Sequence, residues 1–224
     1  MKATTRRRTI TAFTVGALGL GGIAVAGPAL AGGDMFVGSR MAAAQQGPGG
    51  GNGYGYDTPM GTRMRDGACL GAGVTTAQGT LTDQQKNTLV AMAQEEKLAH
   101  DLYAAFAARH PAPIFDRIAT AETQHLSAIR TLLARYGVSD PTAGASAGTF
   151  DDSSAQATYD RLLARGTAGQ AAAFQVGQEV ERADIADLRE ALTGLTAADV
   201  TQVYQRLLTA SRRHLTAFTA WAAR

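Results

Sequence analysis

The stretch that decides the fold is IATAETQHLSAIRTLLARY, residues 118–136. Its apolar side chains recur at spacings of three and four residues, which places them along one face of a helix. Two polar residues, Glu122 and His125, lie on that same apolar stripe. Their spacing projects both side chains from one helix face, so they can share one metal ion or bind two adjacent ions. The stretch therefore predicts an amphipathic helix with a polar site inside a helix bundle.

Three further segments also carry polar residues on their apolar stripes. The polar residues on these stripes are Glu96 in the first segment, Glu181 and Asp184 in the third long segment, and His214 in the fourth. With Glu122 and His125 they bring four carboxylates and two imidazoles to one interior. Burial of unpaired carboxylates is costly, so a cation must neutralise them. Two divalent metal ions would balance four negative charges, and this donor set suits iron, manganese or zinc.

Helix boundary signals predict an all-α fold. The expected helices span residues 82–109, 114–136, 155–165, 167–194 and 196–224, the first of them beginning with a capping box at Thr82. The sequence has no alternating β-branched pattern and no hairpin dipeptide between apolar runs. Two hairpins of long helices are joined by a long crossover that contains the short extra helix. This order describes a four-helix bundle with ferritin-like connectivity, with its domain boundary at residue 81.

The N-terminal part of the sequence predicts two further segments. Residues 1–31 have the order of an export signal, with a basic stretch, an apolar run and the small residues Ala29 and Ala31 at a cleavage site. The basic triplet at residues 6–8 resembles a twin-arginine signal, although ordinary secretory signals are basic too. A retained membrane anchor is the alternative. Residues 32–80 are glycine-rich and predict a disordered tether. We therefore expect an exported bacterial protein, secreted or held in the cell envelope.

The composition excludes several classes of function. The formal net charge is +2, and the basic residues form no stripe with interleaved aromatic side chains, so nucleic acid is not an expected partner. Cys69 is the one cysteine, which excludes an intrachain disulfide and a thiolate metal cluster. The sequence also lacks a fused rubredoxin-like cysteine module. A redox-active protein of this kind would need a separate electron donor.

Four ordered motifs carry a family resemblance. They are EEKLAHDLY at residues 95–103, AETQH at 121–125, GQEVERADIADL at 177–188 and SRRHL at 211–215. Together they resemble the DUF2202 domains, a branch of the ferritin-like superfamily. The resemblance covers about residues 81–224 and implies a four-helix bundle with a metal centre in its core.

The wider diiron carboxylate pattern implies a set of metal ligands in this sequence. They are Glu96 on the first helix, Glu122 and His125 on the second, Glu181 on the third long helix and His214 on the fourth. The resemblance also places Tyr103 near the site. Ser211 stands where the usual fourth helix supplies a glutamate, and Asp184 resembles the extra carboxylate of rubrerythrin-like sites. The replacement would leave either an open coordination position or a site that holds only one ion firmly.

Several of these residues have a simpler interpretation. Glu96 could form a surface pair with His100, Glu181 and Asp184 could form the polar edge of an acidic helix, and His214 could donate to a carbonyl in the core. The neighbouring residues also carry expectations. We expect Asp101 to hydrogen-bond a ligand histidine, and Glu95, Glu179 and Asp187 to face solvent.

The sequence thus predicts an oxidoreductase with a dinuclear centre that reacts with oxygen or peroxide. Iron is the first expectation for the two divalent ions and manganese the second. One alternative is a non-enzymatic metal-binding protein of the envelope. Another is a structural or interaction bundle whose polar core holds no metal. A homodimer is a further expectation.

Overall fold

The computed structural model describes residues 73–224, which form five helices and no strand. The helices are α1 (Asp83–Ala107), α2 (Ile114–Arg135), α3 (Ser153–Gly166), α4 (Gln170–Ala191) and α5 (Ala198–Ala222). The predicted all-α fold is confirmed. The expected export signal at 1–31, and the expected tether as far as residue 72, lie outside the described residues.

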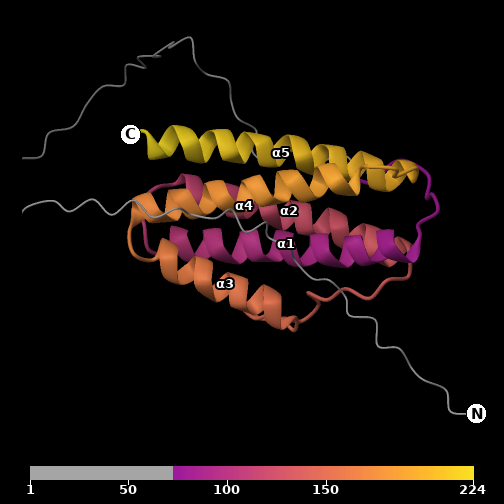
Figure 1. The fold of residues 1–224 in the computed structure, drawn as a ribbon, viewed down its shortest axis with the longest axis horizontal. Coiled ribbons are helices and arrows are strands. Elements are labelled where there is room, and N and C mark those ends of the chain that lie inside the picture. The colour runs from indigo at the N-terminus through magenta and orange to yellow at the C-terminus, as the bar shows by residue number, and fades with distance from the viewer. Residues whose placement is uncertain (1–72) are drawn as a thin grey trace, which may run out of the picture. The chain divides into compact units, whose positions relative to one another are not determined.

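The four long helices form two hairpins (Figure 1). α1 packs on α2 and α4 packs on α5, and the short loops between them make each pair antiparallel. The hairpins meet where α2 contacts α5 and α1 contacts α4. The crossover from α2 to α4 contains α3, which packs on α1 and α4. This is the four-helix bundle with a long crossover and a short extra helix that the sequence predicts.

The helix ends follow the local sequence closely. Thr82 and Gln85 form the predicted capping box, with each side chain accepting a hydrogen bond from the other residue's backbone N–H, at 3.2 and 2.9 Å. Both ends of α4 differ from the expectation, because it begins at Gln170 rather than near residue 167 and ends at Ala191 rather than near residue 194. The preceding helix α3 continues to Gly166, where an added Cβ would lie 2.2 Å from the Phe106 ring. The turn between α3 and α4 therefore uses the residues that were expected to begin α4.

Two apolar clusters fill the bundle. The first contains Tyr103, Phe106, Phe115, Phe174 and Phe218, and the second contains Leu89, Ile129, Leu132, Leu188 and Tyr204, among others. On each long helix the residues of the first cluster and those of the second are separated along the sequence by the polar positions of the core. A buried polar layer therefore lies between two apolar ends.

Residues 73–80 contact the bundle although they form no helix. Val74 packs against the second apolar cluster, and its carbonyl accepts a hydrogen bond from Arg135 at 2.7 Å. The backbone N–H of Gly79 donates to the Tyr136 hydroxyl at 3.1 Å and to Asp199 at 3.3 Å. The expectation that the tether is disordered up to residue 80 is thus wrong for its last eight residues, because their backbone groups find partners on α2 and α5.

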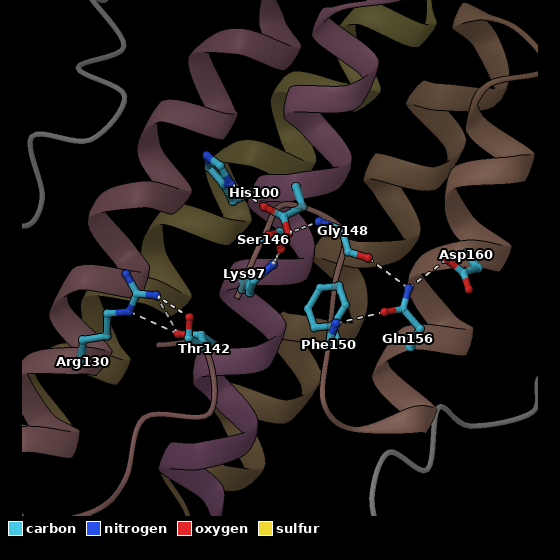
Figure 2. A network of polar contacts seen from close by, with 10 residues as sticks. Lys97, His100, Arg130, Thr142, Ser146, Gly148, Phe150, Gln156 and Asp160 are labelled. Atoms are coloured by element: carbon cyan, nitrogen blue, oxygen red, sulfur yellow. Dashed lines mark hydrogen bonds and ion pairs between the residues drawn. The ribbon is translucent and has the colours of Figure 1, made fainter. Parts of the chain in front are cut away.

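The loop between α2 and α3 is held to α1 by a polar network (Figure 2). Lys97 donates to the Ser146 carbonyl at 2.9 Å and lies over the Phe150 ring at 4.4 Å from its centroid. Asp101 accepts from the Gly148 backbone N–H at 2.8 Å and forms a buried ion pair with Lys97. These contacts fix the crossover against the outer side of α1. Among the helices of residues 73–224, none is long and apolar enough to cross a membrane.

Candidate metal centre

The polar layer brings together side chains from all four long helices. Those that are nearly inaccessible to solvent are Glu96 on α1 (3% exposed), Glu122 and His125 on α2 (3% and 1%), Glu181 on α4 (2%) and His214 on α5 (3%). All five are among the six metal ligands expected from the sequence. The simpler interpretations of Glu96 as half of a surface pair and of Glu181 as a solvated edge are excluded by this burial.

These residues form two overlapping donor groups. In the first, one donor atom each from Glu96, Glu122 and His125 lies within 4.8 Å of the others. In the second, Glu122, Glu181 and His214 meet the same criterion. Glu122 belongs to both groups, so it stands at the centre of the layer.

The two oxygens of Glu122 face different histidines. Its Oε2 lies 2.6 Å from Nδ1 of His125, and its Oε1 lies 2.9 Å from Nδ1 of His214. The outer carboxylates complete the pairs, with Glu96 Oε2 at 3.3 Å from His125 Nδ1 and Glu181 Oε1 at 3.7 Å from His214 Nδ1. The imidazole rings stack at a centroid distance of 5.5 Å. The layer is therefore nearly symmetric about Glu122.

The orientation of these donors fits a metal ion better than mutual hydrogen bonding. Within residues 73–224, neither His125 Nδ1 nor His214 Nδ1 has a hydrogen-bond partner, although carboxylate oxygens lie close to both. Glu96 Oε1 also lacks one. Buried polar atoms are rarely left without partners in native proteins. Donor atoms that converge without hydrogen-bonding one another leave a position for a cation. Carboxylates with imidazoles are the donors that iron, manganese and zinc accept.

The carboxylates of the layer raise the pKa values of both histidines. Burial lowers the pKa of His214, but the charges of Glu122 and Glu181 outweigh it and raise that pKa to about 10. The pKa of His125 is likewise raised above its usual range, because the charges of Glu122 and Glu96 outweigh burial. The two imidazoles in turn hold the pKa of Glu122 below its usual range against the effect of burial. Protons on the imidazoles thus neutralise part of the layer when no metal does.

The pKa values of the two outer carboxylates are raised, unlike that of Glu122. Burial raises the pKa of Glu96 well above its usual range, and it raises the pKa of Glu181 as well. The Tyr103 hydroxyl donates a hydrogen bond to Glu181 Oε1 at 2.8 Å, and Tyr103 is itself fully buried. Tyr103 therefore lies at the site, as expected, and orients one of its carboxylates.

Asp184 and Ser211 lie beside the two donor groups rather than within them. The Ser211 hydroxyl donates to the Leu207 carbonyl at 2.8 Å and interacts with the Asp184 carboxylate. Burial, followed by the charge of Glu181, raises the pKa of Asp184 to about 7. Asp184 Oδ1 has no hydrogen-bond partner in the part of the chain that the structure describes. Of the six expected ligands, this is the one that the structure leaves outside both tight groups.

The structure corrects two expectations about the side chains next to the ligands. Asp101 bonds Lys97, Gly148 and His100 Nδ1 (2.9 Å) in the crossover network, and not a ligand histidine. Its helical position, five residues after Glu96, turns it toward α3 and the loop instead of the bundle interior.

Glu95 is the second correction. It was expected to face solvent, but it is only partly exposed and its Oε2 is buried without a hydrogen-bond partner among the described residues. Burial, then the charges of Asp187 and Asp184, raises its pKa well above the usual range. Asp187 is also partly buried, and burial raises its pKa. Glu179 is also only partly exposed, with 38% of its side chain accessible, and it pairs with Arg165 and Arg161 at the surface.

The family model described as "Uncharacterized protein domain (DUF2202)" matches residues 85–222, which include all five helices apart from the first two residues of α1. The chain belongs to the DUF2202 family. The resemblance seen in the four motifs is thereby confirmed. The match contains every residue of both donor groups, so the polar layer lies wholly within the DUF2202 domain.

A relative and a solved structure extend this match. The chain is 33% identical over 138 residues to "Uncharacterized protein MJ0754" from Methanocaldococcus jannaschii, covering 62% of this chain and 75% of the relative. It also superposes on the crystal structure of hypothetical protein MJ0754 with a TM-score of 0.65 and 31% identity, covering 66% of this chain and 85% of that one. Both comparisons support the DUF2202 assignment and the helical architecture.

Proposed function

We propose that this DUF2202 bundle binds two divalent metal ions, iron in the first place and manganese in the second, one at each donor group. The observation that carries the proposal is the position of Glu122. Each of its oxygens faces a different histidine Nδ1, at 2.6 and 2.9 Å, in a layer where those nitrogens have no hydrogen-bond partner among the described residues. Glu122 would therefore be a ligand available to both ions.

The remaining donors would divide between the two ions. Glu96 and His125 would hold the first ion and Glu181 and His214 the second, with Glu122 shared. Asp184 lies near enough to the second group for the charge of Glu181 to shift its pKa, so it is available as a further carboxylate there. The two divalent charges would balance the four carboxylates of these residues.

We propose further that the centre is an oxidoreductase site that uses oxygen or peroxide. A bound iron or manganese pair would supply the electron transfer that no side chain here can provide. The chain itself contributes two things. The apolar ends of the core exclude bulk water, and Tyr103 holds a proton at its hydroxyl against Glu181. On α5, Ser211 stands where a glutamate would supply a further ligand, which would leave a coordination position open. Electrons would come from a separate donor protein or small molecule.

Metal analysis of the purified protein tests the binding step. We expect about two iron or manganese ions per chain, and we expect Glu122→Ala to lose both because the carboxylate is common to the two groups. Glu179→Ala is the matched control, since it removes from α4 a partly exposed carboxylate that pairs with Arg165 and Arg161 and belongs to neither donor group, so it should keep the wild-type metal content. A wild-type protein that takes up no divalent ion would leave the polar layer as a structural hydrogen-bond and ion-pair network.

A second measurement separates catalysis from simple binding. The reduced, metal-loaded protein is mixed with oxygen or with hydrogen peroxide in a stopped-flow spectrophotometer. Rapid oxidation of the bound metal, absent in Glu122→Ala, supports the oxidoreductase. A loaded protein whose spectrum does not change within minutes would instead be a non-enzymatic metal-binding protein.

Export belongs to the same proposal and rests on residues 1–31 alone. A mature protein should begin near Gly32, as seen by intact mass or N-terminal analysis of the secreted material. Recovery of the chain from a membrane fraction with Met1 to Ala31 still attached would favour a retained anchor.

A further inference from the structure

Four buried polar atoms beside the metal centre lack hydrogen-bond partners in residues 73–224. They are Glu96 Oε1 and Glu95 Oε2 on α1, Asp184 Oδ1 on α4 and the Tyr204 hydroxyl on α5. A single atom of this kind can be an isolated local defect. Four of them on three neighbouring helices indicate that something polar outside the chain completes them.

The acidic residues of α4 continue outward from the centre. Glu181, Asp184 and Asp187 follow one another at spacings of three, which keeps them close to one helix face. Glu181 is 2% exposed, whereas Asp184 and Asp187, further along the helix, are only partly buried. We name these three residues the acidic ladder. Its inner end is a residue of the second donor group.

The other helices present further polar groups to the ladder. On α1, which packs on α4, Glu95 directly precedes the ligand Glu96, and its Oε2 is buried without a hydrogen-bond partner among the described residues. On α5, which also packs on α4, Tyr204 is only 1% exposed, and its hydroxyl likewise has no partner in residues 73–224. The two helices that pack against the ladder helix therefore each keep a buried oxygen without a partner.

We propose that the acidic ladder, with Glu95 facing it, is the route by which divalent cations reach the metal centre. This inference rests on the proposed metal-binding function. A hydrated cation would meet the oxygens of Asp187 and Glu95 first, and it would pass Asp184 to reach Glu96 and Glu181. The donors along this route are carboxylate oxygens and a phenol oxygen, which suit hard divalent ions.

The route is a path rather than a storage site. Among residues 73–224, the groups of three donor side chains within 4.8 Å of one another are the two of the metal centre, and neither contains Glu95, Asp184 or Asp187. The ladder oxygens are thus too widely spaced to enclose an ion together. An ion passing them would keep part of its water shell and would leave readily for the tighter donors beyond.

A groove on the opposite hairpin provides the competing route. It lies between α1 and α2 and is lined by His100, Thr123, Thr120 and Asp116 together with alanines. Asp116 is its one carboxylate, and none of the unpartnered buried atoms of the described chain belongs to its lining. Because the groove offers a cation one exposed acid and no buried oxygen, we assign the passage to the ladder.

The rate of metal uptake tests the route separately from the equilibrium binding. Metal-free protein is mixed with Co²⁺ in a stopped-flow instrument, and coordination is followed by the visible absorption of the bound ion. We expect Asp187→Asn and Glu95→Gln each to slow uptake, and the double variant to slow it by about tenfold or more. The final metal content, measured by elemental analysis after long incubation, should equal that of the wild type.

Asp116→Asn is the matched control, because it removes one exposed carboxylate from the competing groove. Its uptake rate should equal that of the wild type. Equal rates in the wild type and the ladder variants, or slow uptake in Asp116→Asn alone, would overturn the route while leaving the metal centre intact. Loss of final metal content in the ladder variants would show that these residues are ligands instead. A wild-type protein that binds no Co²⁺, Fe²⁺ or Mn²⁺ at equilibrium would overturn the proposed function itself. Circular dichroism melting of each metal-free variant separates slow uptake from misfolding.

Discussion

The Tyr103 hydroxyl donates a hydrogen bond to Glu181 across the interface between α1 and α4, at 2.8 Å. Tyr103 is fully buried and Glu181 is 2% exposed, so water cannot replace this bond. Removal of a donor from a buried carboxylate typically costs about 1–3 kcal/mol. The pair therefore links the stability of the bundle to the geometry of the second donor group.

Tyr103→Phe should destabilise the metal-free protein and weaken its second metal ion. We expect a loss of about 1–3 kcal/mol in the free energy of unfolding, measured by urea titration. Metal affinity should fall by about 10–100-fold, the usual effect of removing a residue that orients a ligand. Tyr159→Phe provides a control, since Tyr159 packs in the first apolar cluster away from the donor groups. Unchanged metal affinity in Tyr103→Phe would show that Glu181 needs no orienting bond.

Removal of metal should lower the thermal stability of the protein. Metal that binds only the native state stabilises it by about 2.7 kcal/mol at a free concentration one hundred times the dissociation constant. Chelation should therefore lower the melting temperature, and added iron or manganese should restore it. The same cycle carried out on Glu122→Ala should leave the melting temperature unchanged. A wild-type melting temperature that is insensitive to chelator would contradict the proposed centre.

Ser211→Glu should make the protein depend more strongly on metal. Ser211 is buried next to Asp184, so a glutamate there adds a carboxylate to an already acidic layer. Without metal, like-charge repulsion should lower the melting temperature below that of the wild type. With metal, the added donor should tighten the second ion and produce a larger metal-induced rise. Ser211→Ala, which adds no donor, should show the wild-type rise.

The residues just before α1 should contribute to stability. A chain beginning at residue 81 loses the packing of Val74 and the bonds that Gly79 makes with Tyr136 and Asp199. Asp199 is fully buried, so loss of a donor is costly there. We expect a lower urea midpoint than for a chain beginning at residue 73. Equal midpoints for the two chains would show that residues 73–80 add nothing to the fold.

The stability contributed by Asp101 should depend on pH. Burial raises the pKa of Asp101, but hydrogen bonds from His100, Lys97 and the Gly148 backbone outweigh it and hold the pKa below its usual range. Because the folded-state pKa is the lower one, the carboxylate stabilises the fold above its unfolded pKa of about 3.9. That stabilisation is lost as the pH falls through the folded value. Asp101→Asn should therefore be less stable than the wild type at pH 7, and the difference should shrink below about pH 4. A difference independent of pH would mean that the hydrogen bonds, and not the charge, are responsible.

The sequence predicted the helices and most of the buried polar layer because both follow from local periodicity. Glu122 and His125 stand on an apolar stripe, and the same stripe positions on the other long helices found Glu96, Glu181 and His214. Periodicity indicates which side of its own helix a side chain occupies. It does not indicate whether a residue beside the apolar stripe is covered by a neighbouring helix. Glu95 was therefore assigned to solvent, although its Oε2 is buried in the folded protein.

Other features depend on pairings that no local pattern encodes. No pattern in the sequence singles out Tyr204, whose buried and unpartnered hydroxyl results from the packing of the helices around it. The start of the ordered chain was also misplaced. Residues 73–80 have the glycine and threonine content of a tether, and their partners on α2 and α5 lie more than fifty residues away in sequence.

Because Glu122 belongs to both donor groups, metal ions bound at the two proposed positions would be thermodynamically linked. An ion held by one oxygen of this carboxylate would restrict the rotation of the other oxygen. Occupancy of either position would then change the affinity of its neighbour, and linkage requires the effect to be equal in both directions. The metal titration of this bundle would then show cooperativity between two unlike positions, and the sign of that cooperativity depends on whether preorientation of Glu122 outweighs repulsion between the two cations.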